Sequence, residues 1–103
     1  MNRFDLNLLY MLHVLLETAS VKESAVRLGA SQAAVSRGLR VLRETFSDHL
    51  LIKTKNGMVL TKRAEQLKEP LALWLAETRR LSCLLHADAA NASEVTPTPP
   101  DLP

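Results

Sequence analysis

Cysteine and long hydrophobic runs are both scarce in this chain. Cys83 is the only cysteine among 103 residues, so no disulfide can form within the chain, and a reducing compartment is the simplest setting. The apolar stretch from Leu8 to Leu16 is interrupted by His13 and ends at Glu17. It is too short for a membrane span and has the wrong pattern for a signal peptide. We therefore expect a cytoplasmic protein.

The sequence also lacks the residue clusters that catalysis requires. It contains no carboxylate pair, no glycine-rich phosphate loop and no set of ligands at metal-binding spacing. Cys83 and His86 could form a nucleophile pair or half of a metal site, but no second pair accompanies them, which favours a role in helix packing. We also expect His13 to serve packing. The sequence predicts neither an enzyme nor a metal or cofactor site.

Acidic residues are scarce in the middle of the chain. Residues 27–63 contain eight Lys and Arg but only Glu44 and Asp48 as acids, whereas the whole chain has a net charge of +2. This local excess suggests an anionic partner. An excess of this size is also common on ordinary solvated surfaces, so the motifs must decide.

Apolar periodicity predicts three helices in the first half of the chain. The first covers residues 5–18, with Asp5 as its N-cap. The second is shorter and ends at Gly29, which tolerates the left-handed conformation of a helix C-terminus. Ser31 can cap a third helix over residues 32–46, which carries apolar residues on one face and arginines on the other. Two helices joined by a short turn, the second basic outside, are typical of a helix-turn-helix.

A β-hairpin is expected after the third helix. Residues 50–54 and 58–61 have strand character, and Asn56-Gly57 between them is a hairpin signal. Behind a helix-turn-helix such a hairpin would form a wing. It could equally be a lid on the core, with its lysines protecting an edge strand from aggregation.

A long fourth helix, capped by Thr61, is predicted from apolar residues spaced alternately by three and four. At 1.5 Å per residue, a helix of roughly 25 residues would be nearly 40 Å long, more than so small a core can cover. The alternative is that this helix packs only on its own domain. We expect instead that much of its apolar stripe, which we call the seam, pairs with a second subunit. Pro70 should remove one backbone hydrogen bond and give a kink or weak point. The residues expected at the dimer seam are Leu67, Leu71, Trp74, Thr78, Leu81 and Leu85.

These patterns divide the chain into three parts. Residues 1–61 would form a mainly α winged helix-turn-helix, with a three-helix core and a small hairpin wing. Residues 62–90 would form the linker and dimerisation helix. Residues 91–103 are rich in Ala, Ser, Thr and Pro, which predicts a disordered tail.

Three segments together resemble the DNA-binding domain of LysR-type transcriptional regulators, a bacterial family. These segments are residues 5–9 (DLNLL), 30–37 (ASQAAVSR) and 57–64 (GMVLTKRA). The resemblance extends over residues 4–87 and is strongest to the branch with the nodulation regulators, which tends to carry a proline where Pro70 stands. It implies a recognition helix, a wing, a linker helix that pairs two subunits, and an effector-binding domain after it. The residues beyond the linker helix are too few to form that domain, so we expect either an excised domain or a naturally short protein.

Four positions depart from the usual family pattern. Ala33 stands where proline is common, Lys53 replaces a frequent arginine at the wing base, and Lys22 occupies a position usually held by a capping Ser or Thr. Gly38 stands where a long polar side chain is usual. A glycine within a helix costs about 1 kcal/mol relative to alanine. We expect Gly38 also to remove a DNA contact, making base preference narrower or weaker.

The resemblance assigns roles to individual residues. Side chains nearest the bases in the major groove would be Gln32, Ala33, Ser36, Arg37 and Arg40. The wing residues Lys53, Lys55 and Asn56 would approach the flanking backbone or the minor groove, and phosphates would be held by Ser31, Thr61, Lys62 and Arg63. Gln32 and Ser36 could instead serve only the helix N-terminus, and Arg43 is expected to contact phosphate or a neighbour within its helix.

We therefore expect a dimeric transcriptional regulator that binds double-stranded DNA with two half-sites and contacts the transcription machinery. The alternative is a winged-helix protein-interaction module whose basic helix binds an acidic partner. Salt-dependent binding to duplex DNA, with preference for one sequence, would distinguish the two.

Overall fold

The structure is a computed structural model that describes the backbone of residues 5–95 and the side chains of residues 5–85. The elements follow one another as α1 (Leu6–Thr18), α2 (Val21–Leu28), α3 (Gln32–Phe46), β1 (Leu51–Thr54), β2 (Gly57–Leu60) and α4 (Lys62–Val95). The expected mainly helical class is confirmed. The chain divides after Ala72 into two compact units, so the start of α4 belongs to the unit that contains α1 to α3 and the hairpin. This boundary lies later than the expected one after residue 61.

Short polar side chains begin each of the first three helices. Asp5 Oδ1 accepts from the Asn7 amide at 2.9 Å, and Ser20 Oγ accepts from the Glu23 amide at 3.0 Å. Ser31 Oγ caps α3 by accepting from the Ala34 amide at 3.0 Å. Because Ser20 already caps α2, the lysine at position 22 does not leave that helix uncapped.

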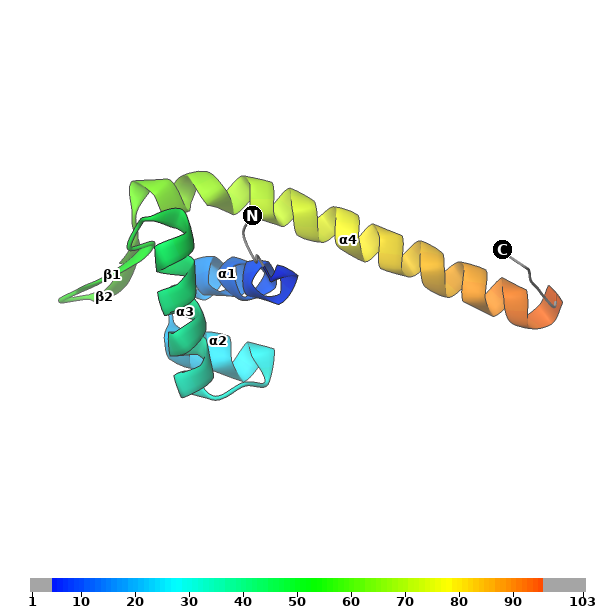
Figure 1. The fold of residues 1–103 in the computed structure, drawn as a ribbon, viewed down its shortest axis with the longest axis horizontal. Helices are drawn as coiled ribbons and strands as arrows, with labels where there is room; N and C mark the ends of the chain where they lie inside the picture. Colours follow the sequence, from blue (N-terminus) through cyan, green and yellow to red (C-terminus); the bar gives the residue numbers. More distant parts are fainter. Residues whose placement is uncertain (1–4, 96–103) are drawn as a thin grey trace. The chain divides into compact units, whose positions relative to one another are not determined.

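The core of the first unit forms where α1, α2 and α3 pack together (Figure 1). Leu12 and Leu15 of α1 and Val35 and Leu42 of α3 are fully buried. The spacing of these residues keeps each helix turned with one face inward, leaving the other face of α3 available for a partner. The side chains buried next to them from the hairpin region and from α4 are Leu50, Leu51 and Ala64.

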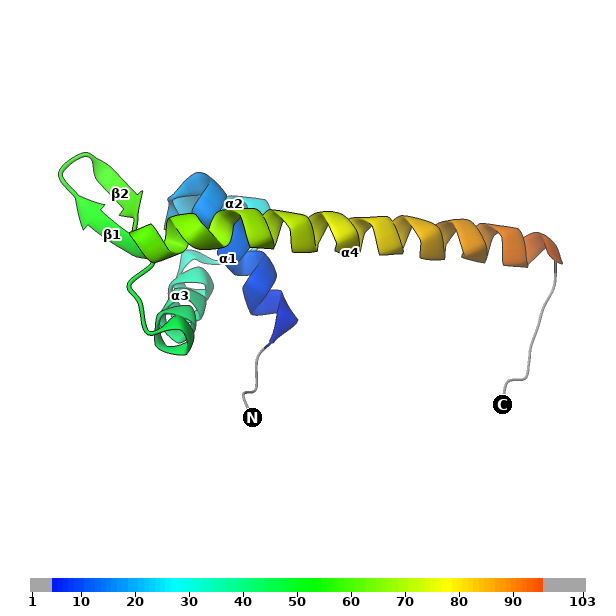
Figure 2. The same ribbon diagram turned by 90° about the horizontal axis from the view of Figure 1, so that it is seen from above.

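The hairpin is antiparallel, and its register pairs Leu51 with Leu60 and Thr54 with Gly57 (Figure 2). The turn therefore consists of Lys55 and Asn56, and Gly57 takes a φ of +113° at the start of β2. Relative to the expected segments 50–54 and 58–61, β1 begins one residue later and ends at the same residue, and β2 lies one residue earlier. Thr54 Oγ1 closes the turn by donating to the Gly57 carbonyl at 2.7 Å.

Gly38 lies on the inner face of α3, against α1. It is buried on the same helical face as Val35 and Leu42. A Cβ at this position would overlap Met11 Sδ and would lie 3.4 Å from Leu8 Cδ2. The prediction that Gly38 removes a DNA contact is therefore wrong, because any side chain here would point into the core. The glycine permits close approach of two helices.

Helix α4 runs through Val95, so it is longer than the expected segment 62–90. The composition of residues 91–95 predicts a tail, but these residues contain no proline to end the helix, and the first proline beyond them is Pro97. The helix continues through Pro70. The remaining tail, residues 96–103, lies outside the described residues. Among the described helices, none has the length and apolar character needed to span a membrane.

Candidate nucleic-acid interface

The outer face of α3 carries every side chain expected in the major groove. This face consists of the exposed residues Gln32, Ala33, Ser36, Arg37 and Arg40. They lie close together because residues three and four apart are neighbours on a helix. We call this set the recognition face.

The two arginines of the recognition face are uncommitted within the fold. Among the described side chains of residues 5–85, neither Arg37 nor Arg40 has a hydrogen-bond or ion-pair partner. Both guanidinium groups carry a full charge and five donors in a planar fork that matches a guanine edge or a phosphate. The fold therefore presents donors and positive charge on the surface of α3 without using them for stability.

The wing places Lys53, Lys55 and Asn56 on its exposed surface. The backbone of Asn56 is held by a 3.3 Å hydrogen bond from its amide to Thr54 Oγ1. The turn geometry thus presents a lysine and an uncommitted side-chain amide at the tip of the hairpin. This is the arrangement expected of a wing that approaches a polyanion.

Not all of the expected phosphate ligands are equally available. Ser31 Oγ is used as a helix cap, although the residue is exposed. Thr61 is half-buried, donates to Asp48 Oδ2 at 2.6 Å, and accepts from the Ala64 amide at 3.1 Å as the cap of α4. Its hydroxyl hydrogen is therefore already used. Lys62 and Arg63 are exposed in the first turn of α4.

Asp48 joins the end of α3 to the start of α4. Its Oδ2 accepts from Thr61 Oγ1 and, at 2.8 Å, from the Leu50 amide. The hydrogen bond from Thr61, followed by that from Leu50 and by the nearby positive charge of Arg63, lowers the pKa of Asp48 below its ordinary value of 3.8. The carboxylate form is thus the one that the fold stabilises.

Arg43 has a role that the sequence did not indicate. Its Nε donates to the His49 carbonyl at 2.8 Å, and a terminal nitrogen donates to the Leu51 carbonyl at 2.9 Å. It was expected to contact phosphate or a neighbour within α3, but both of its partners lie in the loop and strand that follow. No local sequence pattern could reveal these contacts, because they depend on how the loop returns past the helix.

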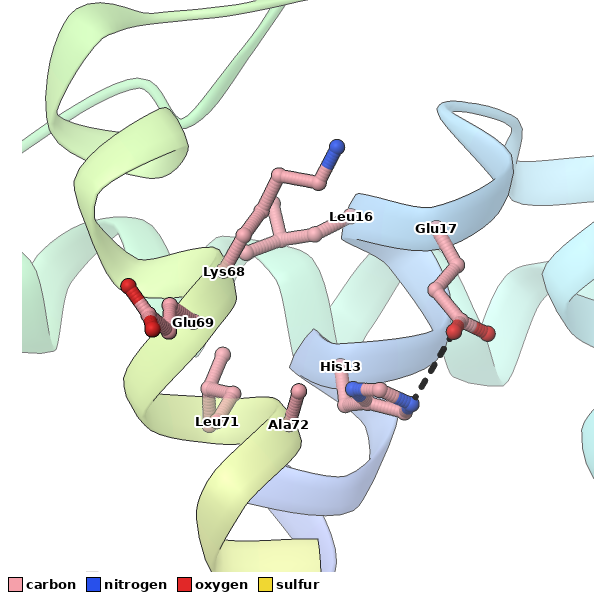
Figure 3. Close-up of a pocket in the computed structure, with 7 residues that line it drawn as sticks. All are labelled: His13, Leu16, Glu17, Lys68, Glu69, Leu71 and Ala72. Carbon is pink, nitrogen blue, oxygen red and sulfur yellow. Dashed lines mark ion pairs between the residues drawn. The ribbon is translucent and has the colours of Figure 1, made fainter.

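A groove of about 310 Å³ lies between α1 and the first part of α4 (Figure 3). Leu16 and Leu71 line it with His13, whose Nε2 is 3.4 Å from Glu17 Oε2. Glu17 also pairs with Arg27 at 3.0 Å. These contacts agree with the expectation that His13 serves packing. Lys68 is the one lysine or arginine among the residues that line the groove, so the groove lacks the basic cluster expected of a DNA-binding surface.

The residues of the expected dimer seam differ in exposure. Leu71 is only 6% exposed, whereas Leu81 and Leu85 are 60% and 66% exposed. Leu67 and Trp74 are intermediate, and Thr78 is exposed with its hydroxyl donating to the Trp74 carbonyl at 2.9 Å. Leu71 therefore has little surface left for a second chain.

The described side chains of the second unit, residues 73–85, include one cysteine and no histidine. Cys83 is exposed and free, and the side chain of His86 lies outside the described residues. Within the part of the chain that the structure describes, no three His, Cys, Asp or Glu side chains come together as metal ligands could.

A three-helix core, a turn before a basic third helix and a following hairpin define the winged helix-turn-helix class of domain. The chain belongs to the LysR family: residues 6–65 match the family described as bacterial regulatory helix-turn-helix proteins. The expected family and fold are confirmed. Proteins of this family are transcriptional regulators, not enzymes.

The chain is similar to the HTH-type transcriptional regulator SyrM of Rhizobium meliloti, a member of the nodulation-regulator branch. The two are 39% identical over 97 residues, which cover 94% of this chain and 30% of that regulator. The regulator SyrM 2 of Sinorhizobium fredii is 38% identical over the same length, with 29% of it covered. The chain thus spans less than a third of the length of these curated relatives.

Solved structures are similar as well. A probable transcriptional regulator from Pseudomonas aeruginosa is 36% identical, with a TM-score of 0.71 over 78% of this chain and 27% of that chain. The DNA-binding domain of BenM, solved in complex with catB site 1 DNA, is 19% identical, with a TM-score of 0.75 over 84% of this chain and 97% of that chain. At this identity the second likeness shows the fold alone.

Proposed function

We propose that this chain binds double-stranded DNA with sequence preference, as part of a dimeric transcriptional regulator. One observation carries the proposal: beside the exposed Gln32, the recognition face presents Arg37 and Arg40, whose side chains have no partner among the described residues. Arginine and glutamine can each form paired hydrogen bonds with one base, arginine with guanine and glutamine with adenine. In this proposal α3 enters the major groove and these side chains read base edges.

The wing and the start of α4 would position the domain on the DNA. Lys53, Lys55 and Asn56 would lie against the flanking backbone or in the minor groove, while Lys62 and Arg63 would contact phosphates. Membership in a family of regulatory helix-turn-helix proteins supports this orientation, as does the fold shared with a domain solved on DNA. Thr61 contributes by capping α4 with its hydroxyl oxygen, because its hydroxyl hydrogen is donated to Asp48 and is not available to a phosphate.

Dimerisation completes the proposal. Leu81 and Leu85 expose most of their surface in the single chain, and pairing of two α4 helices would cover them. Two recognition helices would then bind two half-sites at a fixed separation. Contact with the transcription machinery and a cytoplasmic location belong to the same proposal, the latter because of the single cysteine.

Selection of binding sites from random duplexes, followed by titration at several salt concentrations, tests this function. We expect one enriched sequence with two half-sites, bound about a thousandfold or more tightly than random DNA. Equal binding to all duplexes and to an acidic polypeptide would contradict sequence reading. It would instead favour a protein-interaction module that recognises negative charge.

A further inference from the structure

The connection between α3 and β1 contains an unusual three-residue turn. Leu50 has a φ of +65°, a left-handed backbone conformation that is unfavourable for a residue with a side chain. The turn is closed by the Leu51 amide, which donates to the His49 carbonyl at 2.6 Å. Leu50 is completely buried, so its conformation and its side chain are both fixed by the surroundings. A strained backbone of this kind persists only where neighbouring groups hold it.

Two charged side chains form hydrogen bonds to the backbone of this turn. Arg43 donates to the carbonyls of His49 and Leu51, the two ends of the turn. Asp48 accepts from the Leu50 amide at its centre and from the Thr61 hydroxyl.

The second strand of the wing is tied to the same point. The Thr61 amide, directly after β2, donates to the Leu50 carbonyl at 3.0 Å. Both ends of the hairpin are thus fastened to the end of α3 through one turn.

We propose that Arg43 and Asp48 are positioning residues that fix the wing relative to the recognition helix. This inference rests on the proposed function and adds to it a cause for the geometry of the wing. Arg43 lies on α3, one turn beyond Arg40 of the recognition face, and therefore transmits the position of that helix directly to the base of β1. We call the hydrogen bonds of Arg43 and Asp48 to this turn the brace. Without the brace, Lys55 would lose its fixed distance from the bases read by Arg37.

The brace predicts a specific pattern of coupling in DNA binding. Arg43→Gln should weaken binding by the factor that Lys55→Ala causes, and Lys55→Ala should then have almost no further effect in that background. Arg37→Ala should keep its full effect in the same background, because α3 itself is unchanged. Arg43→Lys keeps the charge but cannot donate to both carbonyls with one planar group, so it should behave like Arg43→Gln.

Other roles give different results. A direct phosphate contact by Arg43 would make the losses from Arg43→Gln and Lys55→Ala multiply, lower the salt slope by about two units in the double variant, and leave Arg43→Lys near the parent. Any one of these three results would overturn the proposal that Arg43 acts as a brace. Arg79→Gln is the control, because Arg79 is exposed and its side chain has no hydrogen bond or ion pair among the described residues. This variant should bind like the parent.

Hydrogen exchange on the free protein tests the brace without DNA. In Arg43→Gln the wing amides from Lys53 to Val59 should exchange at least about tenfold faster, while the amides of α1 keep their protection. Unchanged wing exchange would overturn the proposal even if DNA affinity falls. If the parent binds no duplex at all, the proposed function fails, and faster wing exchange alone would then establish the brace as a property of the fold.

Discussion

At the scale of single residues, the two faces of α3 do different work. Arg37 points outward and has no partner among the described residues, while Gly38 next to it is buried against Met11. The residue at position 37 is therefore free to serve binding, whereas the residue at position 38 is limited by helix packing. Changes at Arg37 should alter binding without altering stability, whereas the effect of a change at Gly38 on stability should depend on whether Met11 can move aside.

Arg37→Ala should weaken binding to the selected site by about 1–3 kcal/mol and relax discrimination at one base pair, because a major-groove contact is lost. Thermal unfolding should be unchanged, since the side chain has no partner in the fold. Titration of specific and random duplexes measures both effects. Equal losses on the two kinds of DNA would show that Arg37 reads no base.

Gly38→Ala tests the close approach of α1 and α3. Alanine should gain about 1 kcal/mol in helix propensity, but its Cβ would displace Met11, so the net change in unfolding free energy should be small. In a Met11→Ala background the same substitution should stabilise by the full amount, about 1 kcal/mol. Urea unfolding of the four proteins in this cycle gives the answer. Equal stabilisation in both backgrounds would mean that Met11 does not limit this position.

At the scale of elements, helix ends and loops carry much of the specificity of the fold. Ser20 and Ser31 each begin a helix, and Thr61 begins α4 while also binding Asp48. The loop that joins α3 to β1 has two residues with positive φ, Ser47 and Leu50. The conformation of this loop depends on hydrogen bonds to the Asp48 carboxylate rather than on a regular backbone hydrogen-bond pattern. Protonation of Asp48 should therefore destabilise the loop.

Stability should fall in acid as Asp48 becomes protonated. The pKa of Asp48 is lowered in the folded state, so its contribution is complete above the ordinary value of 3.8 and is lost as the pH falls through the lower folded value. Asp48→Asn should lower the melting temperature at pH 7 and make the acid dependence below pH 3.8 shallower. Circular dichroism melts over a pH series measure this.

The control for that series is Glu44→Gln. Glu44 is an exposed acid near the end of α3, and its side chain has no hydrogen bond or ion pair among the described residues. Its replacement should change the melting temperature little at either pH. An identical acid dependence in the parent and in Asp48→Asn would contradict the role assigned to this carboxylate.

At the scale of the whole molecule, the second unit exposes leucine side chains that a partner helix would bury. Leu73, Leu81 and Leu85 each expose more than half of their surface in the single chain. Only Leu81 and Leu85 lie on the expected seam. Leu71, also on that seam, is already buried and would report on folding rather than on association.

Replacing both Leu81 and Leu85 with Lys should split the dimer and leave the helix-turn-helix folded, because charges cannot be buried unpaired at a helix interface. The monomer should bind a duplex with two half-sites at least about tenfold more weakly, since the avidity of paired domains is lost. Sedimentation equilibrium and DNA titration on the same samples provide the measurements.

Leu73→Lys is the control, because it adds a charge at a similarly exposed leucine away from the seam. It should remain dimeric. A double variant that stays dimeric, or a monomer with the affinity of the parent, would contradict this account of α4.

Local signals predicted the helices well, whereas contacts between distant segments were missed. Asp5, Gly29 and Ser31 act at helix ends as their chemistry predicts, because capping involves neighbours in sequence. At Gly38 the family pattern predicts a lost DNA contact, and this prediction is wrong. The spacing of Gly38 from Val35 and Leu42 is the signal that indicates the buried face of α3. Arg43 could not be predicted, since its partners are carbonyls placed by the turn that follows α3.

The separation of the recognition face from the core has an evolutionary consequence. Exposed positions whose side chains make no hydrogen bond or ion pair among the described residues can usually be substituted at a cost below about 0.5 kcal/mol. Gln32, Arg37 and Arg40 fit that description, whereas the brace at Arg43 and the packing at Gly38 do not. A duplicated copy of this gene could therefore acquire a new operator through a few changes on one helix, while its fold stayed intact.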